Sequence, residues 1–174
     1  MRTIRAAHMR DVPAVAAIYE ATHTGEEQGL TTIGWVRGVY PTEETARRAC
    51  EAGELYVMEQ DGVIAASARF NQAQETCYQK ADWLLDAPPE RVLVMHTLVV
   101  APKYKGQGCG KAFIAWYEET ARAMGRTSLR MDANERNLAA RALYKRLGYR
   151  EAGIVPCTFN GIGGVNLVCL EKVL

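Results

Sequence analysis

The chain has 174 residues, of which 48% are apolar and 24% are charged. This length suits a single domain over residues 1–174, and the composition excludes collagen-like, disordered and membrane-spanning classes, because no apolar run approaches the roughly 20 residues of a membrane helix. The 21 basic and 20 acidic side chains leave a net charge of +1. A surface with so little net charge lacks the broad basic field that binding to nucleic acids requires.

The cysteines and histidines are widely spaced. No CxxC or HxxxH pair occurs among the five cysteines and three histidines, so the sequence predicts no metal site and no redox motif. The first ten residues carry charges and no apolar core, which argues against a signal peptide. With thiols expected to stay reduced, the sequence predicts a cytoplasmic protein that has neither a membrane nor a nucleic acid as partner.

The chain begins with a short predicted strand over residues 4–6. Asp11 is expected to cap the helix that follows, because its carboxylate can accept the unpaired N–H groups of a first turn. Apolar residues then recur at helical spacing over 12–19. Residues 23–41 are rich in glycine and threonine and predict an irregular segment.

The next elements are a helix and a hairpin. Thr42 is expected to cap a helix that ends at Gly53. Two apolar runs, 55–60 and 63–70, are joined by Asp61-Gly62, the dipeptide most typical of a tight β-hairpin.

The second half alternates strands and helices. Residues 71–91 form a polar connection, and the almost continuously apolar run 92–100 predicts a strand buried on both faces. The remaining predicted elements are a helix over 111–123, a strand over 128–132, a helix over 137–147, and strands over 149–155 and 165–172. A strand–helix–strand unit implies a parallel pair, whereas the hairpin is antiparallel, so the sequence predicts a mixed sheet with helices packed on it.

A glycine-rich turn over residues 99–111 separates the buried strand from the next helix. Gly106, Gly108 and Gly110 occupy alternate positions, which allows close backbone approach to a ligand. Their N–H groups lie at a predicted helix N-terminus, and with the nearby lysines they predict a phosphate site.

Two nucleotide-binding motifs fail at this turn. In the Walker pattern, Lys105 stands where the first glycine belongs and Ala112 where the metal-binding hydroxyl belongs. The GxGxxG pattern fails because residue 111 is lysine. A nucleotide-binding protein is therefore the weaker interpretation.

The turn instead resembles the pyrophosphate loop of the GNAT superfamily of N-acetyltransferases, which reads Arg or Gln followed by xxGxG or xxGxA. Lys105-Gly-Gln-Gly-Cys-Gly110 matches it except that Lys105 keeps the cation and loses the forked donor. A second segment, NLAARALYKRLGY over residues 137–149, resembles the family's later helix NxxAxxLYxxxGF, with Tyr149 in place of Phe. The resemblance covers residues 92–174, and the first ninety residues resemble the family only in the order of their elements.

The resemblance implies an α/β (α+β) fold with a GNAT-like mixed, mostly antiparallel sheet of about seven strands, a central splayed parallel pair and about four flanking helices. It implies acetyl-CoA as co-substrate, with no metal. The cofactor-binding residues it implies are Leu98, Val99, Val100, Lys105, Gly106, Gln107, Gly108, Cys109, Gly110, Lys111, Asn137, Ala140 and Tyr144.

The resemblance also implies direct attack of an amine on the thioester. Tyr144 matches the tyrosine that protonates the departing thiolate. His96 is the candidate base, because an unperturbed histidine pKa of about 6.5 suits proton acceptance near neutrality. Glu90 is the alternative carboxylate, and a water chain is a further option because 92–100 contains no acidic residue.

A covalent acetyl-cysteine mechanism is a less favoured alternative. Cys109 lies at a helix N-terminus, which lowers a thiol pKa, but it occupies the phosphate turn, far from the thioester. Cys157, in the predicted connection between the last two strands, is expected to line a wall.

Acceptor recognition is expected from the irregular segments, with Arg37 as a clamp for a substrate carboxylate. The candidate acceptor residues are Trp35, Arg37, Tyr40, Asn71, Tyr78 and Phe159. The expected partner is a small-molecule amine, and the protein is expected to be a monomer or a homodimer. The alternatives are a non-catalytic acetyl-CoA-binding sensor and an enzyme that acetylates a protein N-terminus or lysine.

Overall fold

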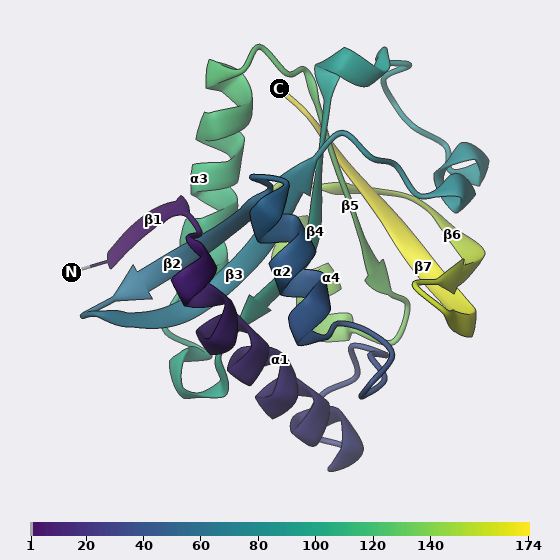
Figure 1. Cartoon of the computed structure of the whole chain (residues 1–174). Helices are drawn as coiled ribbons and strands as arrows, with labels where there is room; N and C mark the ends of the chain where they lie inside the picture. Colours follow the sequence, from purple (N-terminus) through teal and green to yellow (C-terminus); the bar gives the residue numbers. More distant parts are fainter. Residues whose placement is uncertain (1) are drawn as a thin grey trace.

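A computed structural model describes residues 2–174. One seven-stranded sheet with the order β1-β2-β3-β4-β5-β7-β6 forms its centre (Figure 1). The strands are β1 (Arg2–Ala6), β2 (Leu55–Gln60), β3 (Val63–Asn71), β4 (Val92–Val100), β5 (Ser128–Asn134), β6 (Arg150–Phe159) and β7 (Ile162–Val173). Every neighbouring pair is antiparallel except β4 and β5, which are parallel. The predicted mixed sheet with one parallel pair is confirmed.

Four α-helices cover the two faces of the sheet (Figure 1). They are α1 (Val12–Glu27), α2 (Glu43–Glu51), α3 (Cys109–Ala123) and α4 (Leu138–Arg146). Side chains of α1 and α2 form one core with Leu55 and Val57 of β2. Side chains of α3 and α4 form a second core on the opposite face with Leu129 and Met131 of β5.

Among the N-terminal elements, one prediction is confirmed and two are wrong. Asp61 and Gly62 have φ values of 51° and 80°, as a tight hairpin turn between β2 and β3 requires. The carboxylate of Asp11 does not cap α1: it accepts hydrogen bonds from Arg5 at 2.7 Å and from the backbone N–H of His8 at 2.8 Å. Helix α1 also continues to Glu27, so the irregular segment begins later than predicted.

The C-terminal hairpin is longer than predicted. β6 extends to Phe159 and β7 begins at Ile162, because both strands continue to pair beyond the apolar runs that the sequence shows. Cys157 therefore lies inside β6, paired with Val165, and not in a connection between strands.

At Thr97, the alternation of side chains along β4 is interrupted, so that odd-numbered residues before and after this point lie on opposite faces of the sheet. Thr97 has a positive φ of 55°, and the register between β3 and β4 shifts between Ser67 and Arg69. Before the bulge, Met95 packs into the α3 core, whereas after it Val99 packs into the α1 core. Without the bulge, Met95 and Val99 would lie on the same face, because side chains two or four residues apart in a regular strand point the same way.

The parallel pair separates at the same point. β4 and β5 are paired from Val92 and Ser128 as far as Met95 and Met131. Beyond this point the two strands diverge (Figure 1). The β5-facing backbone edge of β4 is consequently not paired with β5 after Met95.

Side chains of β5 alternate between the two faces. Leu129 and Met131 belong to the core beneath α3. Arg130 and Asp132 point to the other face, where they bond to Gln74 and Tyr78 of the connection between β3 and β4. Asp132 therefore approaches the divergence of the strands from the face opposite α3 and α4.

Candidate active site

A cavity of about 90 Å³ lies where β4 and β5 diverge. It is lined by Ile33, Gly34, Trp35, Tyr40, Met95, Thr97, Leu98, Asp132, Ala133, Asn134, Asn137, Ala140, Tyr144, Phe159, Val165 and Leu167. The structure thus brings four of the predicted cofactor residues together with three of the predicted acceptor residues.

The glycine-rich turn follows β4. Gly106 and Gly108 both have φ of 77°, a left-handed conformation that glycine adopts without strain. Gly108 precedes α3, whose first turn has no side-chain cap. A Cβ atom on Gly110 would lie 3.4 Å from the Leu143 side chain, an ordinary contact distance, so Gly110 lies against α4.

This geometry suits a phosphate ligand. The backbone N–H groups of an uncapped first turn attract anions, and the 15-residue helix α3 adds the favourable end of its dipole. Lys105 and Lys111 flank the turn with exposed side chains. Cys109, in contrast, is buried, and its Sγ lies 3.9 Å from Gln60 Oε1, away from the cavity lining.

Tyr144 is positioned by α4. Asn137 caps this helix, because its side chain accepts a hydrogen bond of 3.2 Å from the backbone N–H of Ala140. Tyr144 lies two turns further along, is 7% exposed, and lines the cavity. Burial, and then the charge of Asp132, raise the pKa of its hydroxyl above the usual value. The hydroxyl therefore stays protonated at neutral pH and can donate.

Asp132 lines the same cavity from β5. Its carboxylate accepts a 2.7 Å hydrogen bond from the Tyr78 hydroxyl. Burial raises the pKa of Asp132 to about 6, the Tyr78 hydrogen bond opposes this shift, and the charge of Glu75 adds to it. A carboxylate with this pKa is ionised at neutral pH and still able to accept a proton.

Sequence reasoning missed Asp132, because it considered acidic residues only within 92–100 and just before this run, at Glu90. A usable signal was present: Asp132 lies towards the end of the strand that is parallel to β4. The carboxyl ends of neighbouring parallel strands meet at one edge, where ligands bind.

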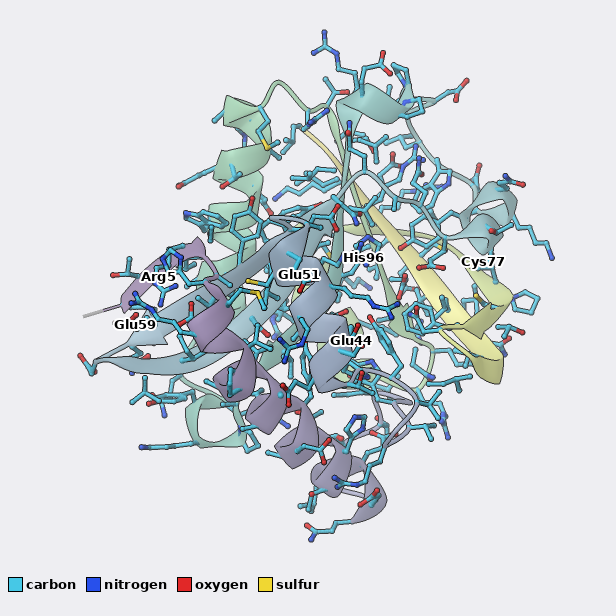
Figure 2. All side chains as sticks on the ribbon, in the orientation of Figure 1. Arg5, Glu44, Glu51, Glu59, Cys77 and His96 are labelled. Atoms are coloured by element: carbon cyan, nitrogen blue, oxygen red, sulfur yellow. The ribbon has the colours of Figure 1, made fainter. Side chains whose placement is uncertain are left out.

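The structure does not bring His96 into the cavity lining. His96 lies on β4 near the centre of the molecule (Figure 2), and its Nε2 is 2.8 Å from Asn71 Oδ1. The amide of Asn71 in turn donates to Glu54 at 3.0 Å. Burial, and then the charge of Arg69, lower the pKa of His96 to about 4. The alternative base, Glu90, is exposed just before the start of β4, whereas the cavity lies beyond Met95.

Three aromatic rings form the wall opposite α4, and we call them the aromatic wall: Trp35, Tyr40 and Phe159. Trp35 and Tyr40 meet edge to face with centroids 6.3 Å apart, and Tyr40 and Phe159 do so at 5.4 Å. The Tyr40 hydroxyl is hydrogen bonded to Thr97 at the bulge of β4. Two segments that are distant in sequence therefore make one continuous surface.

The other predicted acceptor residues are engaged elsewhere. Arg37 is ion-paired with Glu20 and Glu27 and does not line the cavity. The amide of Asn71 bonds Glu54 and His96, and the Tyr78 hydroxyl bonds Asp132.

The structure therefore combines a mixed sheet with one divergent parallel pair, a cavity at that divergence and a glycine-rich turn before α3. The model of the acetyltransferase (GNAT) family matches residues 14–149. The chain belongs to this family.

Individual relatives agree with this assignment. The uncharacterized N-acetyltransferase YesJ of Bacillus subtilis is 27% identical over 103 residues, which are 59% of this chain and 56% of that protein's length. A GNAT-family acetyltransferase from Streptococcus agalactiae superposes with a TM-score of 0.83 at 24% identity, covering 99% of this chain and 95% of its own. A protein from Salmonella typhimurium solved with its cofactor acetyl-CoA superposes with a TM-score of 0.70 at 21% identity, covering 99% and 94%.

No helix within residues 2–174 combines the length and the apolar character needed to cross a membrane. Within the same range, no three His, Cys, Asp or Glu side chains are grouped as metal ligands would be.

Proposed function

We propose that the protein is an acetyl-CoA-dependent N-acetyltransferase that acts on small primary amines. The observation that carries this proposal is the cavity at the divergence of β4 and β5, which Asp132 and Tyr144 line from opposite faces of the sheet. An acid and a base that meet in one cavity, beside a phosphate-binding turn, are what acyl transfer to an amine requires.

The residues present fit acetyl-CoA. The turn from Lys105 to Lys111 would hold the pyrophosphate, because the left-handed Gly106 and Gly108 lead into the uncapped first turn of α3, whose N–H groups attract an anion. The unpaired edge of β4 from Leu98 onward would bond the amide arm of the ligand. When bound, acetyl-CoA supplies the acetyl group as a thioester.

Asp132 and Tyr144 would handle the protons. As the amine nitrogen bonds to the acyl carbon and the carbon–sulfur bond breaks, the Asp132 carboxylate takes the proton that the nitrogen loses. The Tyr144 hydroxyl gives a proton to the departing sulfur, and solvent returns both groups to their starting states. The raised pKa values of both side chains suit these roles. This proposal replaces His96 with Asp132 as the base.

The test combines calorimetric titration of acetyl-CoA with detection of acetylated amines by mass. We expect acetyl-CoA to bind the wild type and Asp132→Asn with similar affinity, because Asp132 is not among the residues proposed to hold acetyl-CoA. Tyr144→Phe should bind it within about tenfold of the wild type, because this variant loses one hydrogen-bond donor to the ligand. Turnover should fall by roughly 10²–10⁴-fold in each variant. In the wild type, kcat/KM should rise as the pH increases through about 6, since Asp132 must be ionised, and this step should vanish in Asp132→Asn.

Tyr56→Phe is the matched control, since Tyr56 packs on Phe70 and Trp116 and does not line the cavity. It should retain wild-type turnover. Binding of acetyl-CoA without an acetylated product from any amine of a broad panel would favour the sensor alternative, and absence of binding would refute the proposal.

A further inference from the structure

We infer that the acceptor is a compact apolar amine without a carboxylate beside its amino group. This inference rests on the proposed function and narrows its substrate class.

The cavity lining carries negative charge only. Asp132 is its one charged side chain, and no lysine, arginine or histidine is among the lining residues of the described chain. An ammonium group is complementary to this surface. A carboxylate on the adjacent carbon would be buried without a cation and close to Asp132, which is strongly unfavourable.

The arginines on the acceptor side of the sheet are already paired. Arg37 is held by Glu20 and Glu27. Arg69 is held by Glu54 at 2.7 Å. A substrate carboxylate would have to displace a protein carboxylate from either guanidinium.

A neighbouring groove contains one further arginine. Arg136 lines it together with Glu26 and Glu135, and the groove shares Gly34 and Trp35 with the cavity. Two carboxylates against one guanidinium leave this groove with a negative formal charge. It therefore does not provide a compensating anion site.

The aromatic wall favours an apolar group next to the amine. Because the Tyr40 hydroxyl is bonded to Thr97, this residue offers its ring to the cavity. The rings of Trp35 and Phe159 extend the same surface and can also attract a cation. A volume of about 90 Å³ is far below that of pockets for drug-sized ligands and admits only a compact group.

The experiment compares pairs of acceptors that differ by one carboxylate. The pairs are phenethylamine with phenylalanine and isopentylamine with leucine, each assayed with saturating acetyl-CoA and read by mass. We expect kcat/KM for the carboxylate-free member to exceed that of its partner by at least about 100-fold. Phe159→Ala should raise KM for phenethylamine and leave the affinity for acetyl-CoA unchanged.

Arg37→Ala and Arg136→Ala are the charge controls. The preference ratio should stay within twofold of the wild type in both. If phenylalanine or leucine is acetylated faster than its carboxylate-free partner, the inference is overturned. If that faster acetylation is then lost in Arg37→Ala or Arg136→Ala, the substituted arginine is the group that binds the substrate carboxylate. If acetyl-CoA binds and neither carboxylate-free amine is acetylated, the inference is also overturned. Failure of acetyl-CoA itself to bind would refute the proposed function instead.

Discussion

Asp132 and His96 are titratable side chains on neighbouring strands, and burial moves their pKa values in opposite directions. The pKa of Asp132 rises to about 6 and that of His96 falls to about 4, because burial disfavours the charged form of each. Only Asp132 lines the cavity. The depressed pKa of His96 therefore bears on stability and not on proton transfer.

His96 should make the fold sensitive to acid. Above pH 6.5 both states hold a neutral imidazole, but below it the unfolded chain takes up a proton that the folded chain refuses until about pH 4. Between pH 7 and pH 5 this should remove about 2 kcal/mol from the free energy of unfolding relative to His96→Gln, whereas the raised pKa of Asp132 adds about 1 kcal/mol in both proteins. Urea denaturation at both pH values measures it. His8→Gln, at an exposed histidine, is the control, and equal pH dependence in all three proteins would contradict the prediction.

Gly108 allows a test of the turn with an internal control. Gly108 and Gly53 have φ of 77° and 70°, and a Cβ atom on either would meet nothing within 4 Å. Alanine at each position should therefore cost about 1 kcal/mol of stability, for the left-handed backbone alone. Only Gly108→Ala should also weaken acetyl-CoA binding, by about tenfold, in calorimetric titration. Equal affinities for the two variants would place the pyrophosphate elsewhere.

At the scale of elements, the connection between β3 and β4 is held to the sheet by a buried ion pair. Arg130 of β5 and Glu171 of β7 are 5% and 2% exposed, and their closest charged atoms are 3.8 Å apart. The Arg130 guanidinium also bonds Gln74 at 2.6 Å and lies 4.2 Å from the Trp83 ring centroid. Gln74 and Trp83 both belong to the connection between β3 and β4, which also contains Tyr78, the residue that donates a hydrogen bond to Asp132.

Arg130→Ala should lower the free energy of unfolding by about 3–5 kcal/mol, because it leaves Glu171 buried beside a lost cation. Arg150→Ala is the matched control: Arg150 pairs with Asp82 of the same connection at 2.8 Å, but at an exposed position. The control should lose less than about 1 kcal/mol. Chemical denaturation compares the two, and similar losses would show that burial of the pair is unimportant.

Elements with local signals were predictable from the sequence. The Asp61-Gly62 hairpin and the glycine turn depend on backbone conformations that their own residues favour. Asp132 and the bulge at Thr97 were not predictable in the same way. The environment of Asp132 depends on Tyr78, which is 54 residues away, and nothing local requires a β-branched residue to adopt a positive φ. The aromatic wall likewise exists only once β6 has packed beside the segment that holds Tyr40.

At the scale of the whole molecule, the cavity lies where β4 and β5 are no longer paired. A ligand that bridges β4, α3 and α4 should stabilise the fold by mass action. At 100 times its dissociation constant, acetyl-CoA should add about 2.7 kcal/mol and raise Tm by roughly 5–10 °C. Thermal denaturation at several ligand concentrations checks this. ATP should give no comparable shift, and an equal shift with ATP would favour a nucleotide site.

The residues proposed to bind the two ligands occupy different parts of the chain. The residues proposed for acetyl-CoA fall within one continuous stretch, from Leu98 to Tyr144. The walls of the acceptor side come mainly from 33–40 and 159–167, on either side of that stretch. If the proposed sites are right, substitutions in these flanking segments should change acceptor choice and leave the affinity for acetyl-CoA unchanged, so the two specificities could evolve separately.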